Sequence, residues 1–195
     1  MKQAIPFACT RCGQCCHTHK TGETVVLYED DIVRICRELM LTPQEFLRTY
    51  SRIYEYTYVT ADARKLLRRL VLPCEHGCAF LSGGHCRIHE IKPFQCRAWP
   101  FLLPTFSWDT GINSSAQFCP GIATGETTAP AIINAFLEDQ DARESIYCRQ
   151  VRDKRTRISR WLNLRPPDRR FEIRRLRDGS ATVCQKLRPR LKGGE

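Results

Sequence analysis

The spacing of apolar side chains predicts two short helices in the N-terminal third of the chain. The first covers 29–39, and its apolar face collects Ile32, Ile35, Cys36 and Leu39. The second begins at the capping box Thr42-Pro43-Gln44-Glu45, where proline takes the first helical position. Phe46, Leu47 and Tyr50 supply its apolar face.

Three further stretches carry patterns typical of β-structure or loops. Alternating positions over 54–72 predict a pair of strands. Gly83-Gly84 lies between the short runs 78–81 and 86–88, which predicts a tight hairpin with a cysteine on each arm. Turn-forming residues dominate 104–125, so we expect Cys119-Pro120-Gly121 to lie in a loop.

The C-terminal part of the chain predicts a long helical region and then a hairpin. Thr128-Ala129-Pro130 starts an apolar helical pattern that continues to Leu162, as one helix or two, and Pro166-Pro167 ends it. Two basic runs flank Asp178-Gly179, which predicts a hairpin with a tight turn.

Composition identifies a soluble globular protein with an unusual number of thiols. The chain has 42% hydrophobic and 27% charged residues, but also twelve cysteines. The first seven residues are too short and too broken by Pro6 for a signal-peptide core, and the apolar stretch 98–106 falls short of the roughly 20 residues that span a bilayer. We expect a cytoplasmic protein without a transmembrane segment, in which reduced thiols favour metal ligation over disulfides.

Charge divides the chain into two unlike parts. The net charge of the whole chain is +10, yet 143–195 alone holds 17 of the 31 basic residues and 6 of the 21 acidic ones. This segment could bind nucleic acid, an acidic partner or an anionic membrane surface, or could simply be solvated. Trp161 and Phe171 are its only aromatic residues beyond Tyr147, so a single-strand stacking platform is not favoured.

The cysteines carry the candidate chemistry. Cys9 and Cys12 have the spacing of a metal-binding knuckle, Gly13 suits its turn, and Cys15 repeats the spacing. This C-x2-C-x2-C run matches the first three ligands of a bacterial ferredoxin cluster, and Cys119-Pro120 has the form of the fourth. Because successive side chains diverge, Cys16 is expected to serve a different centre from Cys15.

Eight cysteines would fill two four-cysteine sites, or one iron–sulfur cluster and one zinc site. The predicted metal ligands are Cys9, Cys12, Cys15, Cys16, Cys78, Cys86, Cys96 and Cys119. The expected cofactor is an iron–sulfur cluster of the 4Fe–4S type, zinc, or both.

Further cysteines, histidines and arginines lie near the motif. Cys74 either completes a site or lies beside one, whereas Cys36, Cys148 and Cys184 are not expected to be ligands. All five histidines are close to cysteines in sequence, and His17 is the first candidate among His17, His19, His76, His85 and His89. Arg11, Arg87 and Arg97 each adjoin a cysteine and could offset thiolate charge.

The order of these motifs resembles the YkgJ-type cysteine-cluster family, whose members share a C-x2-C-x2-C-C signature. The resemblance covers roughly 7–122 and includes Cys78-Ala79-Phe80-Leu81, Cys86-Arg87-Ile88-His89, Lys92-Pro93, Cys96-Arg97-Ala98-Trp99-Pro100 and Cys119-Pro120-Gly121. His89 stands where the family usually has an aromatic residue, and Lys92 where it usually has arginine. The resemblance implies a zinc- or iron-chelating domain, related to flagellin lysine N-methylases.

We therefore expect an α+β fold with three parts. A small loop-rich domain over 1–125 is organised by metal, a helical extension over 126–165 packs on it, and 166–195 forms a basic hairpin tail. The first functional hypothesis is electron transfer or an oxidoreductase-type step on a protein partner. The alternatives are a zinc-stabilised module whose basic tail binds an acidic partner or nucleic acid, and a protein-lysine methyltransferase-like enzyme. No Rossmann, catalytic-triad or H-E-x-x-H motif is present.

Overall fold

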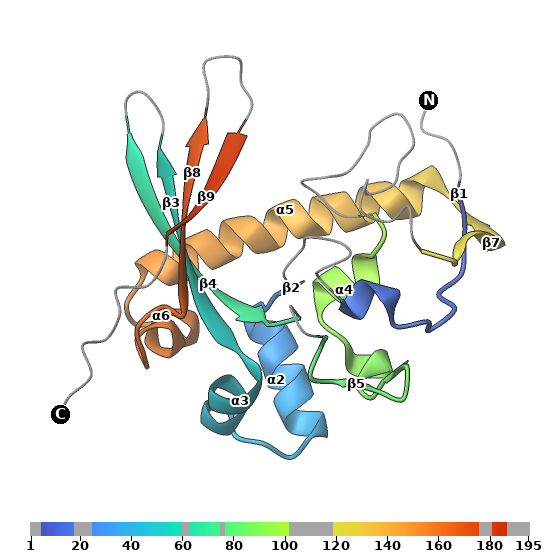
Figure 1. Ribbon diagram of the computed structural model, residues 1–195, viewed down its shortest axis with the longest axis horizontal. Helices are drawn as coiled ribbons and strands as arrows, with labels where there is room; N and C mark the ends of the chain where they lie inside the picture. The colour runs from blue at the N-terminus through green and yellow to red at the C-terminus, as the bar shows by residue number, and fades with distance from the viewer. Residues whose placement is uncertain are drawn as a thin grey trace.

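A computed structural model describes residues 5–17, 25–59, 63–74, 77–101, 119–175 and 181–186 of the chain (Figure 1). Its strands are β1 (Ile5–Phe7), β2 (Val25–Val26), β3 (Arg52–Val59), β4 (Arg64–Leu72), β5 (Leu81–Ser82), β6 (His85–Cys86), β7 (Ile122–Thr128), β8 (Arg169–Arg175) and β9 (Ala181–Lys186). Its helices are α2 (Glu29–Glu38), α3 (Pro43–Tyr50), α4 (Phe94–Ala98), α5 (Pro130–Arg152) and α6 (Arg157–Leu162), with the 3-10 turns η1 (Gln14–Cys16) and η2 (His89–Ile91).

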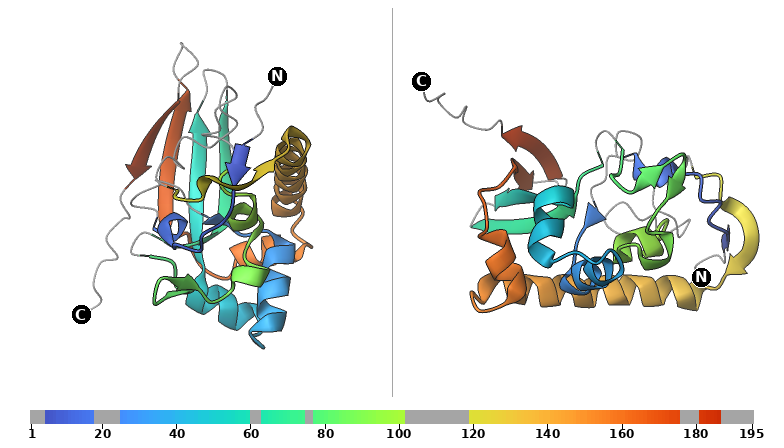
Figure 2. Two further views of the ribbon diagram at one scale, coloured as in Figure 1. Left: turned by 90° about the vertical axis from the view of Figure 1, so that its right-hand side faces the viewer. Right: turned by 90° about the horizontal axis from the view of Figure 1, so that it is seen from below.

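The long helix α5 joins the two ends of the molecule. Its 23 residues extend for about 35 Å, from β7 beside the cysteine-bearing segments to α6 beside the largest sheet (Figures 1 and 2). Pro130 occupies the first turn of α5, and the helix ends at Arg152. Thr156 then caps the next helix, α6, by accepting a hydrogen bond from the Ser159 N–H. The helical region predicted from the sequence is thus two helices.

The largest sheet has the strand order β2-β4-β3-β8-β9. β3 and β4 pair antiparallel along their whole length, from Arg52 opposite Val71 to Val59 opposite Arg64. β8 then pairs with β3 in parallel, and β9 returns antiparallel beside β8. The basic hairpin predicted at the C-terminus is therefore built into this sheet.

The two faces of this sheet are covered by different helices. Arg69 of β4 and Tyr54 of β3 lie opposite each other, and Arg69 donates two hydrogen bonds to Glu144 of α5, at 2.9 and 2.5 Å. Ile53 and Leu70, which point to the other face because side chains alternate along a strand, border a cavity beside α3 and α6. Tyr147 of α5 also accepts a hydrogen bond from the Leu70 N–H at 2.9 Å.

Two small sheets hold the cysteine-bearing segments. β1 pairs antiparallel with β7, which brings the beginning of the described chain beside 122–128. Apolar alternation predicts neither of these strands, because 122–128 is largely polar and exposed. β5 and β6 form the predicted hairpin around Gly83-Gly84, and Cys86 lies on its second arm. Cys78 precedes the first arm, which corrects the expectation of a cysteine on each arm.

A buried carboxylate on α2 positions the segment that leads into α4. The Asp31 side chain is fully buried and accepts hydrogen bonds from the backbone N–H of Tyr28, at 3.3 Å, and of Phe94, at 2.9 Å. Arg34 forms an ion pair with Asp31 at 2.6 Å and also donates to the carbonyls of Ile91 and Lys92. Because α4 begins at Phe94, this network holds the helix that carries Cys96.

The expectation of a mixed α+β fold with short helices, small sheets and a long C-terminal helix is confirmed. Both short helices predicted near the N-terminus are present, and Thr42 accepts a hydrogen bond from the Glu45 N–H as its capping box requires. The predicted strand pair begins two residues earlier than expected, at Arg52. Among the described residues, no helix is long and apolar enough to cross a membrane.

Replacing Asp31 with alanine should destabilise the protein strongly, because two buried backbone N–H groups and the Arg34 guanidinium lose their acceptor. We expect the free energy of unfolding in urea to fall by about 3 kcal/mol or more. The neighbouring Asp30→Ala is the control: its carboxylate is half exposed and pairs with Arg143, so its loss should cost less than about 1 kcal/mol. Equal effects of the two substitutions would contradict the role of Asp31.

Candidate metal centre

The first four cysteines lie on an irregular turn between β1 and His17. Arg11 and Gly13 both adopt left-handed backbone conformations, with φ of 57° and 72°. The Cys16 N–H then donates to the Gly13 carbonyl at 3.0 Å and closes η1. The left-handed residues coil the chain tightly, so that Cys9, Cys12, Cys15 and Cys16 all border one cavity.

A backbone hydrogen bond joins this turn to the second cysteine segment. The Cys78 N–H donates to the Cys16 carbonyl at 2.9 Å. Cys74 lies on the same segment, where its carbonyl accepts from the Gly77 N–H at 3.0 Å. Cys74 and Cys78 are both buried, so this turn carries two thiols into the interior beside Cys16.

A second backbone hydrogen bond joins the other end of the N-terminal run to Cys119. The Ala8 N–H donates to the Gly121 carbonyl at 3.1 Å. The contact is so close that a Cβ atom on Gly121 would lie 2.2 Å from the Ala8 carbonyl oxygen. Glycine is therefore required at this position for Cys119 to approach Cys9.

Nine thiols line a single cavity of about 180 Å³. They include all eight predicted ligands and one more: Cys9, Cys12, Cys15, Cys16, Cys74, Cys78, Cys86, Cys96 and Cys119. Within the described parts of the chain, no three cysteine, histidine or acidic side chains already stand in an arrangement that would hold a metal ion. The thiols surround the cavity without converging on one point, so ligation requires side-chain rotation.

Four of the thiols lie close enough together to influence one another's ionisation. Cys16 and Cys74 favour the thiolate of Cys78, which lowers the pKa of Cys78 and raises the pKa of both neighbours. Cys16 also lowers the pKa of Cys15, with help from the Lys92 charge. Cys15, Cys16, Cys74 and Cys78 therefore form one group of neighbouring thiols.

Burial dominates the remaining thiols of the cavity. It raises the pKa of Cys96 well above the usual value for a thiol and also raises the pKa of Cys86. The pKa of Cys119 is raised first by burial and then by the charges of Cys12, Cys15 and Cys9. Neutral thiols are thus favoured here, and ligation would release protons.

Three basic side chains and one unpaired donor also line the cavity. Arg11, Lys92 and Arg97 supply positive charge, while Arg87 is outside the lining and donates to the Ala79 carbonyl. The indole N–H of Trp99 is buried and, among the described residues, is the one buried side-chain nitrogen or oxygen without a hydrogen-bond partner. These residues would suit a sulfur-rich group in the cavity. The thiols could ligate its metal, the cations could offset its negative charge, and the unpaired N–H could donate to sulfur.

The other cysteines and histidines occupy different places. Cys36 is buried in the core, Cys148 is half-buried on α5, and the Cys184 side chain lies outside the described residues. The His17 ring lies beside Gly77 and is not part of the lining, and His85 is exposed on β6. His19 and His76 lie outside the described residues, whereas His89 borders the cavity.

Sequence reasoning left Cys74 undecided and did not identify Lys92 or Trp99 as part of the site. Cys74 lies four residues before Cys78, and this spacing marks it as a possible member of the site. Nothing in the sequence, however, shows that both thiols point inward. Lys92 could be found only through its place between Cys86 and Cys96.

A family model named CxxCxxCC, described as "Putative zinc- or iron-chelating domain", matches residues 8–120, more than half of the chain. The two ends of the matched region lie side by side, because Ala8 bonds to Gly121. The comparisons with curated proteins and with solved structures each gave no match.

Gly121→Ala should separate Cys119 from the N-terminal cysteines, because the new methyl group would overlap the Ala8 carbonyl oxygen. We expect a loss of about 2 kcal/mol or more, seen as a melting temperature about 4–8 °C lower. Gly83→Asn is the control: a Cβ there meets no atom within 4 Å, and asparagine tolerates its left-handed backbone. A melting temperature unchanged by Gly121→Ala would show that the close approach is not required.

Proposed function

The chain belongs to the CxxCxxCC family, and on that premise we propose that its cavity holds an iron–sulfur cluster of the 4Fe–4S type together with zinc, for electron transfer to a protein partner. Metal binding follows from the family. The observation that supports the finer proposal is the gathering of nine thiols around one cavity.

The number of thiols favours more than one centre. A closed structural zinc site uses four ligands and leaves no open space at its centre. Nine cysteines exceed that set by five, and they line a cavity far larger than one ion needs. Thiolates are soft ligands that select zinc and iron–sulfur clusters over hard cations such as magnesium. A cluster and a zinc ion that were each held by four cysteines would use eight of these nine thiols.

The residues around the thiols suit a redox centre near the surface. When bound, an iron–sulfur cluster would supply one-electron transfer. Lys92, Arg11 and Arg97 would offset the charge of a four-thiolate centre, which is about −2. Cys9, Cys12 and Cys15 are exposed, so a partner could approach this side of the cavity closely.

Removing a cavity thiol tests the iron–sulfur proposal. In protein purified without oxygen, we expect iron and sulfide by chemical analysis, visible charge-transfer absorption and an EPR signal on reduction. Cys96→Ser should reduce the iron content and the absorption together, because Cys96 is a cavity thiol carried by α4. Cys148→Ser, outside the cavity, should leave both unchanged. Colourless wild-type protein that contains only zinc would rule out the cluster.

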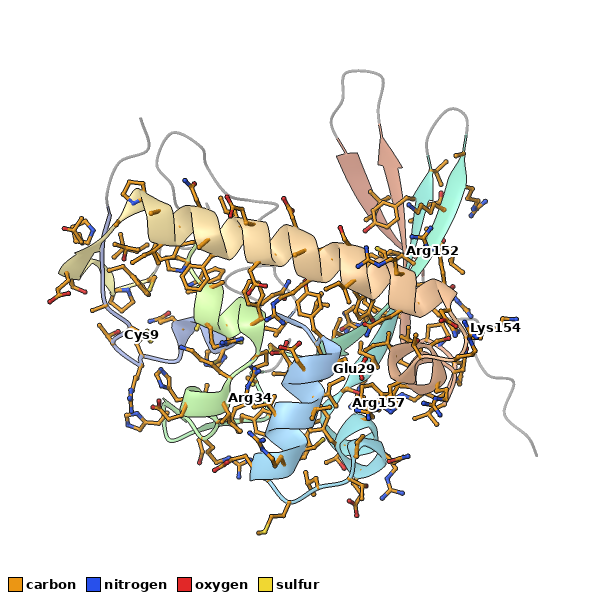
Figure 3. All side chains as sticks on the ribbon, turned by 180° about the vertical axis from the view of Figure 1, so that it is seen from behind. Cys9, Glu29, Arg34, Arg152, Lys154 and Arg157 are labelled. Atoms are coloured by element: carbon orange, nitrogen blue, oxygen red, sulfur yellow. The ribbon has the colours of Figure 1, made fainter. Side chains whose placement is uncertain are left out.

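A zinc-stabilised binding module is the second candidate, and an exposed basic corner supports it. Arg152, the last residue of α5, and Lys154, which follows it before α6, are exposed at the end of α5 far from Cys9 (Figure 3). We propose that this corner contacts an acidic partner. Removing 166–195 would be a poor test, because β8 pairs with β3 and Phe171 stacks on Tyr56 at 5.1 Å.

Charge reversal at this corner is the cleaner experiment. The double variant Arg152→Glu, Lys154→Glu should weaken salt-dependent binding of an acidic polymer such as heparin at least tenfold, because two cations become anions. The double variant Arg37→Glu, Arg48→Glu, on α2 and α3, is a control with the same change of net charge and should bind as the wild type does. Equal binding by all three proteins would exclude the corner as the contact surface.

A further inference from the structure

His89 is placed differently from the other histidines that the structure describes. It begins the turn η2 and borders the cysteine-lined cavity, whereas His17 and His85 do not. Its Nε2 atom lies 3.8 Å from the Sγ atom of Cys9, although the two residues are 80 positions apart in the chain. The fold therefore brings an imidazole nitrogen to the thiol that opens the cysteine motif.

The distance between these atoms is the spacing of two ligands on one zinc ion. With a zinc–sulfur bond of about 2.3 Å and a zinc–nitrogen bond of about 2.0–2.1 Å, a tetrahedral angle places sulfur and nitrogen about 3.6 Å apart. The observed 3.8 Å is close to that value. A small rotation of either side chain would bring both atoms to ligating distance.

The partners of His89 fix which ring nitrogen is available. Nδ1 lies 3.1 Å from the Glu90 carboxylate, which can only accept, so Nδ1 carries the proton and donates it. Nε2 lies 3.4 Å from the Lys92 ammonium, which can only donate. Both contacts leave the lone pair on Nε2, the atom that faces Cys9, as metal ligation requires.

Glu90 gives His89 the support that metal-binding histidines usually have. A ligating histidine commonly donates its other N–H to a carboxylate, which fixes the ring orientation and raises its basicity. The Glu90 carboxylate is in turn held by Arg11 at 3.2 Å. Since Arg11 lies between Cys9 and Cys12, this chain of contacts runs from the histidine back to the cysteine turn.

Two further thiols are available to the same ion. Cys12 lies on the same turn as Cys9, and the bond between Ala8 and Gly121 holds the Cys119 segment beside that turn. Both thiols line the cavity. The remaining six thiols of the cavity include the group around Cys78, in which Cys74 and Cys78 are buried.

We propose that Cys9, Cys12, Cys119 and His89 form a three-cysteine, one-histidine zinc site, separate from an all-thiol centre drawn from the other six cysteines. This inference rests on the proposed function, because it divides the donors of the same cavity. The Lys92 ammonium, on its flexible side chain, moves off Nε2 when zinc binds and remains beside the thiolates, where it offsets the net charge of about −1.

The test uses the full-length chain, purified without oxygen, with zinc and cobalt as probes. His89→Gln should lose one zinc equivalent while keeping the metal of the all-thiol centre. His85→Gln, the matched control on β6, should keep the wild-type metal content. Glu90→Ala should weaken zinc binding about 10–100-fold in competition with a chelator, because the acceptor that orients the imidazole is removed.

His89→Cys separates a ligand from a merely structural residue. This variant should retain the zinc, and its cobalt form should show stronger sulfur-to-metal charge transfer because a fourth thiolate replaces nitrogen. An unchanged cobalt spectrum, or full zinc retention by His89→Gln, would overturn the role of His89. Wild-type protein that binds no metal would instead refute the proposed function.

Discussion

Two backbone hydrogen bonds, one at each end of the N-terminal cysteine run, hold the metal centre together. Ala8 bonds to Gly121 on one side and Cys78 bonds to Cys16 on the other. Between them, the seven residues 9–15 are held beside segments that lie far along the chain. Together with the pairing of β1 with β7, these two bonds set the position of the exposed thiols of the run relative to the buried thiols. The site therefore depends on a short irregular turn that is held at both ends by backbone hydrogen bonds. The largest sheet and α5 form the rest of the fold against which these segments pack.

Gathering nine thiols has an electrostatic consequence that shapes the surroundings. Thiolates repel each other, and burial further disfavours their charged form, as the raised pKa of Cys96 shows. One charge is favoured at Cys78, because the neighbouring thiols of Cys16 and Cys74 lower its pKa. Additional thiolates need a cation, supplied partly by Lys92 and chiefly by metal. Metal binding and the folding of this region are therefore coupled, since the metal removes the repulsion that the folded arrangement creates.

The sequence predicted those features that depend on local chemistry. The capping box at Thr42, the proline at the start of α5 and the Gly83-Gly84 turn each produce the expected element because neighbouring residues determine it. Features that depend on contacts far apart in the chain were not predicted. The pairing of β8 with β3 has no local signal, and the polar strand β7 forms only because β1 lies beside it. The site follows the same rule: the cysteine motif identified eight cavity thiols, but the inward position of Cys74 and the contact of His89 with Cys9 require the tertiary structure.

The uneven distribution of charge along the chain is explained in part by ion pairs between its two parts. The basic segment pairs with acidic residues of the N-terminal part: Arg143 with Asp30 at 2.7 Å, Arg157 with Glu29 at 3.6 Å and Arg170 with Glu55 at 3.0 Å. Arg143 also lies over the Phe94 ring at 4.6 Å, at the start of α4. Part of the basic excess therefore fastens α5, α6 and β8 to the rest of the fold. Phe94 begins α4, the helix that carries Cys96, so Arg143 contacts the helix that borders the metal centre. A partner that disturbed the ion pairs of α5 would therefore also affect the position of α4.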